Sequence, residues 1–143
     1  MIIDKLNAFA LKTDFFGSAG TEQLGDAIDL GAFPTDMGEG LPYYLVALVT
    51  TAMAGGTSVQ VNLVTADNDA LTAAPVTLLS SAVIPVADAT AGARVLMVAI
   101  PKADYKRYLG ITVTRVGTST AGALSAFLTQ DPPNWRAYSG GLN

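Results

Sequence analysis

The chain has 143 residues, with 8 lysines and arginines, 12 aspartates and glutamates, and no histidine or cysteine. This composition excludes thiol chemistry, disulfides and thiolate-bound metals, and it removes the most common general base at neutral pH. The formal net charge of −4 argues against nucleic acid as a partner, because such affinity comes largely from clustered basic side chains. The length supports one domain that folds without a disulfide or a metal.

The charge content is low, at 14% of residues, where about 25% is typical. The polar faces must therefore be built from Thr, Ser, Asn, Gln and small residues. Such a surface is easily desolvated, which suits a protein packed against neighbours and equally suits a soluble domain with a neutral surface. The longest apolar run, Tyr43 to Val49, is far shorter than the ~20 residues of a spanning helix. We expect no membrane segment, and no secretory signal at the start of the chain.

Strand-like patterns follow one another along the sequence, either as alternating apolar and polar residues or as short apolar runs rich in β-branched side chains. A strand-like pattern opens the chain, and residues 13–42 are predicted to be irregular because they are rich in Gly and small residues. In chain order the predicted strands are residues 1–10, a short one at 27–30, then 43–51, 58–63, 76–84, 94–100, 108–114 and 123–129. The runs 43–51 and 94–100 are typical of strands buried on both faces.

Glycine-rich turns separate these segments. Ala54-Gly55-Gly56 and the run from Gly117 to Gly122 are typical hairpin loops. About eight short strands joined in this way predict an all-β protein, an antiparallel sandwich or barrel over residues 1–130. Residues 131–143 are predicted to be an extended C-terminal arm, because Pro132-Pro133 cannot donate to a sheet ladder.

No constellation predicts catalysis. Asp67-Asn68-Asp69 resembles the start of a calcium loop, but Thr72 and Leu78 stand where such a loop needs Gly and Glu, so a solvated turn is favoured. The basic residues Lys102, Lys106 and Arg107 are interpreted as a solvated loop, with an acidic patch on a partner as the alternative. There is no Gly-x-Ser-x-Gly elbow and no phosphate-binding loop. We expect no enzyme activity, no cofactor and no metal.

Large aromatic side chains near the two ends of the chain are the candidate partner contacts. They are Phe15, Phe16, Trp135 and Tyr138. Aromatics on arms are common anchors in protein interfaces. The alternative is that both arms fold back on their own sandwich and cover an edge or an open end. The sequence leaves both possibilities open.

Several short segments, in order and at consistent spacing over most of residues 1–129, carry a family resemblance. They are Met1-Ile2-Ile3-Asp4, Gly55-Gly56-Thr57-Ser58 leading into Val59-Gln60-Val61, Thr65-Ala66-Asp67-Asn68-Asp69-Ala70, Ala91-Gly92-Ala93-Arg94, Arg107-Tyr108-Leu109-Gly110, and Val116-Gly117-Thr118 with Thr120-Ala121-Gly122. In these the chain resembles the small capsid cement, or decoration, proteins of tailed bacteriophages, typified by a Bordetella phage cement protein. It departs from that pattern at Leu71, where an aromatic residue is expected.

The resemblance implies a jelly-roll sandwich that self-associates and lies on the outer surface of a phage head, where it bridges major capsid subunits. It implies the virion as location, with synthesis in the host cytoplasm, and no catalytic residue to carry over. We expect a homo-oligomer, with a dimer favoured over a trimer. The alternative function is a carbohydrate-binding jelly-roll module on a virion or tail. A sugar platform is poorly supported, because Tyr43, Tyr44, Tyr105 and Tyr108 lie at strand starts and only Phe127 is well inside a strand.

Overall fold

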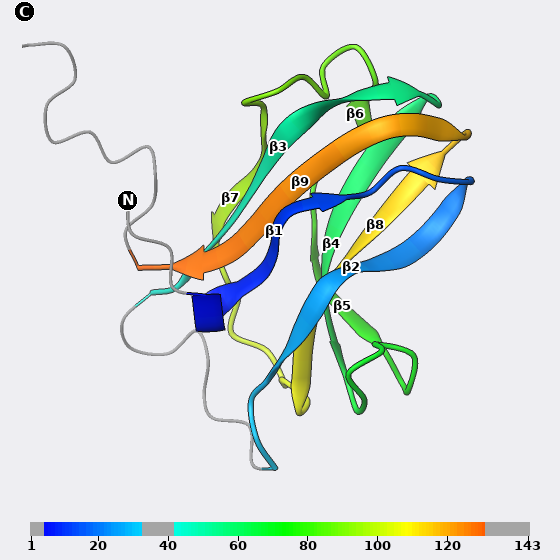
Figure 1. Cartoon of the computed structure of the whole chain (residues 1–143). Coiled ribbons are helices and arrows are strands. Elements are labelled where there is room, and N and C mark those ends of the chain that lie inside the picture. The colour runs from blue at the N-terminus through cyan, green and yellow to red at the C-terminus, as the bar shows by residue number, and fades with distance from the viewer. Residues whose placement is uncertain (1–4, 33–41, 131–143) are drawn as a thin grey trace, which may run out of the picture.

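A computed structural model describes residues 5–32 and 42–130 (Figure 1). These residues form one short 3-10 turn and nine strands, with no α-helix among them. The elements are η1 (Lys5–Asn7), β1 (Ala8–Asp14), β2 (Gly20–Asp29), β3 (Tyr44–Gly55), β4 (Ser58–Ala66), β5 (Val76–Ser80), β6 (Ile84–Pro85), β7 (Arg94–Ala99), β8 (Tyr108–Val116) and β9 (Ser119–Thr129). None of the described helical segments is long or apolar enough to cross a membrane.

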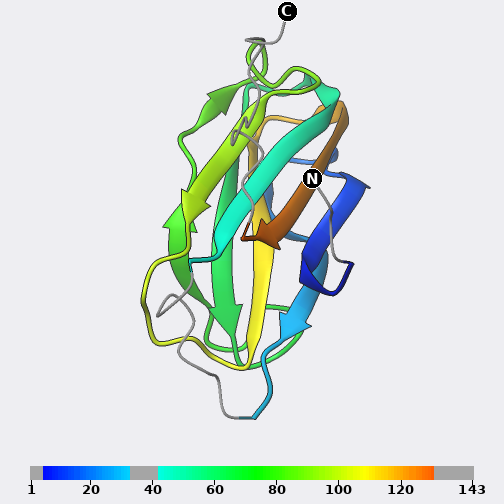
Figure 2. The same cartoon turned by 90° about the vertical axis from the view of Figure 1, so that its left-hand side faces the viewer.

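The strands form two antiparallel sheets packed face to face. Sheet A has the order β1-β9-β3-β7, and sheet B has the order β2-β8-β4-β5, with β6 also pairing with β4. Figure 2 shows sheet A in front of sheet B. Setting aside the two-residue β6, the chain passes from one sheet to the other at every connection except that from β4 to β5, and the two strand orders are those of a double Greek key. The predicted fold class, an antiparallel jelly-roll sandwich, is confirmed.

The core lies between the sheets and follows from the alternation in the sequence. In sheet B, Val61 pairs with Val113 and Leu63 with Ile111, so all four side chains point to the same face. They are buried against residues of sheet A, among them Leu45 and Leu124. Burying side chains of this size contributes about 1.5–3 kcal/mol each relative to exposure. This apolar layer is the main reason that the two sheets stay together.

The structure corrects the prediction that residues 13–42 are irregular, because β2 occupies Gly20–Asp29. In β2 only Leu24 is fully buried. The strand lies at the edge of sheet B and pairs with β8. An edge strand with one buried side chain gives little alternation in sequence, so only the short segment 27–30 was predicted.

Two other predicted boundaries differ. The first strand begins at Ala8, after the 3-10 turn, and runs to Asp14. The predicted strand 76–84 is divided into β5 and β6. Ser81 lies at the division, where its backbone N–H donates to the Val61 carbonyl and its Oγ accepts a hydrogen bond from the Val61 N–H. The Ser81 side chain thus accepts the hydrogen bond of a β4 backbone N–H at the point where the neighbouring strand β5 has ended.

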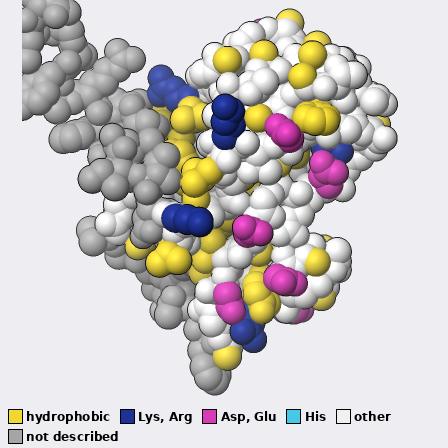
Figure 3. All heavy atoms as spheres, in the orientation of Figure 1, with side chains coloured by type: hydrophobic (Ala, Val, Ile, Leu, Met, Phe, Trp, Pro, Cys, Tyr) yellow, Lys and Arg dark blue, Asp and Glu magenta, His cyan; other side chains and the backbone are white. Residues whose placement is uncertain are grey.

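Four turns at one end of the sandwich contain no charged side chain, although the exposed Asp14 and Asp88 adjoin them. We call the end formed by residues 15–20, 52–57, 82–86 and 116–120 the hairpin end, and these four segments contain no Asp, Glu, Lys or Arg. The opposite end, which we call the charged end, includes residues 29–32, 66–75 and 100–107 and carries Asp29, Asp67, Lys106 and Arg107. Figure 3 shows acidic and basic side chains at the lower, charged end and also over the upper half of the same face.

Candidate interaction surface

The four turns of the hairpin end form one continuous surface. Gly17 and Ser119 exchange two backbone hydrogen bonds of 3.1 and 2.9 Å, which joins the first turn to the last. The Thr57 N–H donates to the Val116 carbonyl at 2.7 Å, and the Val86 N–H donates to the Thr57 carbonyl at 2.9 Å. Every turn is therefore bonded to a neighbouring turn, and the surface is held in one shape.

Three large apolar side chains are exposed at or beside these turns. Phe16 is 47% exposed, Val83 is 59% exposed and Val116 is 54% exposed. They lie among Ser, Thr, Gly and Ala, with no charge in the four segments to desolvate. Contact between these segments and another protein would therefore bury no charged side chain without a counterion. This combination makes the hairpin end the best candidate for an interaction surface among the described residues.

A buried arginine, Arg115, is hydrogen-bonded to the first turn of this surface. Arg115 continues the inward-facing series of β8, and its side chain is only 4% exposed. Its guanidinium donates to the carbonyls of Phe15 at 2.7 Å and Ser18 at 3.0 Å and to the Glu22 carboxylate. These bonds fix the turn between β1 and β2. The hydrogen bond from Arg115 lowers the pKa of Glu22 below its usual value of 4.5.

The structure separates the predicted pair Phe15 and Phe16. Phe15 is fully buried, and its N–H donates to the Gly122 carbonyl at 3.0 Å. A Cβ placed on Gly122 would lie 2.7 Å from the Phe15 ring, so the ring fills the space that this glycine leaves open. Phe15 is thus a core residue on this chain, and Phe16 alone is presented at the surface. The other two predicted contacts, Trp135 and Tyr138, lie outside the described residues.

At the charged end, two of the three predicted basic residues are held by partners of the same chain. Arg107 donates two hydrogen bonds, of 3.0 and 2.9 Å, to the Asp29 carboxylate. Lys106 bonds the Asp67 carboxylate at 3.1 Å and the Ala74 carbonyl at 2.6 Å. These contacts favour the solvated-loop interpretation over an acidic patch on a partner.

The Asp67-Asn68-Asp69 turn is organised by its asparagine. Asn68 Oδ1 accepts hydrogen bonds from the N–H groups of Thr72 and Ala73, both at 2.9 Å. The oxygen that a calcium loop would offer to the ion is therefore used within the loop. Over residues 5–32 and 42–130, no group of three or more Asp, Glu, His or Cys residues is placed to hold a metal.

The pair of Arg107 and Asp29 yields a pH prediction. The hydrogen bond from Arg107, with a second from the Gly31 N–H, lowers the pKa of Asp29 from 3.8 to about 2. Since the folded-state pKa lies below the unfolded value, the stabilisation from this group is complete above about pH 4 and is lost as the pH falls toward 2. An NMR titration should place the Asp29 midpoint near 2, and Arg107→Ala should raise it. A midpoint that is the same with and without Arg107 would contradict this assignment.

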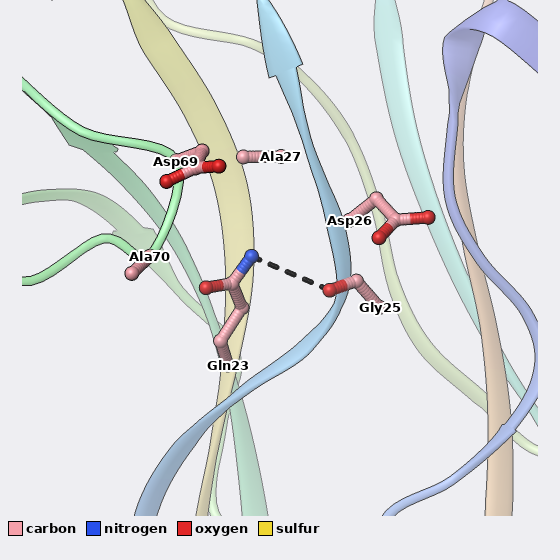
Figure 4. A pocket seen from close by; sticks show the side chains of 6 residues that line it. All are labelled: Gln23, Gly25, Asp26, Ala27, Asp69 and Ala70. Atoms are coloured by element: carbon pink, nitrogen blue, oxygen red, sulfur yellow. Dashed lines mark hydrogen bonds between the residues drawn. The ribbon is translucent and has the colours of Figure 1, made fainter.

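A hollow of about 460 Å³ lies beside β2 and the 67–75 loop (Figure 4). Gln23, Gly25, Asp26, Ala27, Asp69 and Ala70 line it. The Gln23 amide donates to the Gly25 carbonyl at 3.3 Å, and Figure 4 shows the Asp26 carboxylate turned away from Asp69 and Gln23. The carboxylates do not converge on one point, and the lining includes no aromatic side chain. The hollow therefore lacks the arrangement of a general acid with a base and the platform of a sugar site.

Three described aromatic residues, Phe127, Tyr105 and Tyr108, do not supply such a platform either. Phe127 is 1% exposed, and Tyr105 is buried with its hydroxyl donating to the Pro101 carbonyl. The Arg107 guanidinium lies over the Tyr108 ring, 5.2 Å from its centroid. These positions give the alternative carbohydrate-binding function no support.

The fold places the protein among jelly-roll β-sandwiches, with four charge-free turns at one end as its candidate contact surface. The chain belongs to the Bbp16 family, whose model matches residues 18–128. The match includes β2 to β8 and almost all of β9, together with three complete turns of the hairpin end. A search of curated proteins gave no match.

Sequence reasoning missed Val83, Val116 and Arg115 as parts of the candidate surface. The signal for the surface was present as charge-free turns at 52–57, 82–86 and 116–120. Each turn alone is ordinary, and only the topology shows that they meet. The alternation Leu109, Ile111, Val113 also predicts that Arg115 faces inward.

Proposed function

We propose that this protein is a cement protein of a tailed-phage head, which binds the outer surface of the shell and bridges neighbouring major capsid subunits. The Bbp16 family name suggests a Bordetella phage protein, and the sequence resembles phage decoration proteins over most of its length. The single observation that carries the proposal is the hairpin end, a charge-free surface that exposes Phe16, Val83 and Val116.

The physical properties of this surface suit adhesion. Because the four turns are hydrogen-bonded to one another and the first of them also to Arg115, little conformational entropy is lost when they meet a partner. Because the segments lack charge, their burial leaves no ion without a counterion. A molecule that touches two capsid subunits also gains from effective concentration, since its second contact is intramolecular.

Such a bridge stabilises the shell by linkage. A protein that binds the mature shell and not the dissociated subunits shifts the equilibrium toward the intact particle. The contribution of each copy is small, and the number of copies makes the total large. No chemical step is needed.

The direct test compares heads with and without the protein. Heads that lack it are expected to release their genome at lower temperature, and adding the purified protein back should restore the original temperature. Release can be followed by the fluorescence of a DNA-binding dye during heating. Equal release temperatures for the two kinds of particle would contradict the cement function.

Single substitutions test the role of the hairpin end. Val116→Lys and Phe16→Ala are each expected to weaken binding to heads about tenfold or more, which corresponds to about 1.4 kcal/mol or more. Co-sedimentation of labelled protein with heads measures the affinity. The matched control is Val76→Lys, which changes another exposed valine, at the charged end of β5. If Val76→Lys weakens binding as much as Val116→Lys, the contact surface lies elsewhere.

Self-association is a separate part of the proposal. A homodimer is favoured, with a trimer as the next candidate, and the major capsid protein is the other partner. The mass of the purified full-length chain in solution, measured by light scattering, tests the first point. A chain that is monomeric at high concentration and also fails to bind heads would contradict both.

A further inference from the structure

The outer face of sheet A, which points away from sheet B, is apolar. In β3 the side chains of Tyr44, Val46 and Leu48 alternate with Leu45 and Ala47, which belong to the core between the sheets. The register places Val46 opposite both Phe127 and Met97, and Phe127 opposite Ala8. One row of apolar side chains therefore crosses all four strands of sheet A, in the order Ala8, Phe127, Val46, Met97.

This apolar row lies on the face of sheet A that points away from sheet B, so packing between the two sheets does not explain its burial. Val46 is 0% exposed and Phe127 is 1% exposed, yet neither belongs to the core cluster between the sheets. The outer faces of antiparallel sheets are usually polar, because they meet water. Here the neighbouring positions Tyr44, Leu48 and Met97 are half-buried as well. A further part of the protein must cover this face.

The chain's last segment follows a strand that ends beside this face. β9 ends at Thr129, which lies opposite Tyr44 and on the same face as Phe127, two residues earlier in the strand. Residues 131–143 therefore begin at the border of the apolar row. They contain the only tryptophan of the chain, Trp135, and a tyrosine, Tyr138. Pro132 and Pro133 prevent this segment from simply extending the sheet.

The length of the segment is sufficient. Trp135 lies six positions after Thr129, a length of chain that can reach about 20 Å when extended, whereas four strands span only about 15 Å. The segment contains one acidic residue, Asp131, and one basic residue, Arg136. It therefore brings no net charge to an apolar face.

We propose that residues 131–143 pack across the outer face of sheet A of their own subunit, with Trp135 over the row formed by Phe127 and Val46. The own subunit is favoured over a second copy because a short connection gives the segment a high effective concentration at this face. This inference rests on the described face of sheet A and is independent of the cement function. Under this proposal the C-terminal arm packs on its own sandwich and does not contact a partner. The hairpin end then remains as the surface for partners.

Trp135 makes the proposal directly measurable, because all tryptophan fluorescence comes from this residue. In the full chain the emission should be that of a shielded indole, with weak quenching by acrylamide. Met97→Lys places a charge on a half-buried position of the row. It should shift the emission to longer wavelength and raise the quenching constant several-fold, while circular dichroism still reports a folded sandwich. The control Val76→Lys, on sheet B, should change neither fluorescence property.

A truncated chain ending at Gln130 is the second variant. It should remain folded, bind the dye ANS more strongly than the full chain, and exchange backbone hydrogens of β3 and β9 faster. An exposed indole in the full chain would overturn the proposal, as would fluorescence that is the same with and without Met97→Lys in folded protein. Shielding that disappears on dilution would assign the segment to a second copy and overturn the own-subunit placement.

Discussion

Replacing Gly25 with alanine is expected to remove more than about 4 kcal/mol from the free energy of unfolding, a loss large enough to prevent folding of many domains. Gly25 lies in β2 with φ of +69°, and a Cβ placed on it would be 2.0 Å from the Phe9 carbonyl oxygen. The obstacle is backbone of β1, which cannot move without disturbing its pairing with β9. Urea unfolding followed by circular dichroism measures the loss.

The matched control for Gly25 is Gly92→Ala. Gly92 has a similar φ of +87°, but a Cβ there would meet no atom within 4 Å. Only the backbone strain remains, about 1–2 kcal/mol. The difference between the two variants isolates the clash with Phe9. Equal losses would show that β1 and β2 are not packed as closely as described.

Replacing Arg115 with alanine is expected to cost about 3 kcal/mol. The change leaves the carbonyls of Phe15 and Ser18 without their donor and removes the side chain that fills this end of the core. Glu22, whose carboxylate is half exposed, is rehydrated and adds little. Urea unfolding again measures the effect, and faster hydrogen exchange of residues 15–20 should accompany it.

Arg107→Ala is the control for Arg115. It removes an arginine that is also paired with a carboxylate, but in a solvent-exposed pair. Exposed ion pairs contribute little to stability, so its loss should be much smaller than that of Arg115→Ala. Similar losses for the two variants would mean that the burial of Arg115 is not the source of its contribution.

The fold could be predicted because the central strands carry their burial in their residue pattern. β4 and β8 alternate, and β3 is a continuous apolar run, which predicted burial on both faces. The same prediction was wrong for β7, which lies at the edge of sheet A and is at most half-buried. Val46 and Phe127 show such two-sided burial in sheet A. The edge strand β2 was predicted only at residues 27–30, because it is paired on one side and buries only Leu24 fully.

The candidate surface was harder to predict. Side chains of neighbouring residues in an extended chain point to opposite sides, so the sequence Phe15-Phe16 shows that one ring is inside without showing which. The deciding fact is the space at Gly122, more than 100 positions along the chain. The hairpin end likewise depends on four turns that are distant in sequence and adjacent only in the fold.

The absence of charged side chains from the four turns of the hairpin end has a consequence for ionic strength. Attraction between charged surfaces weakens as dissolved ions screen it, over about 8 Å at physiological concentration. The hairpin end offers no such attraction to lose. A cement protein bound to a phage head through these four turns would therefore stay attached at both low and high ionic strength. High salt would, if anything, strengthen the apolar contacts.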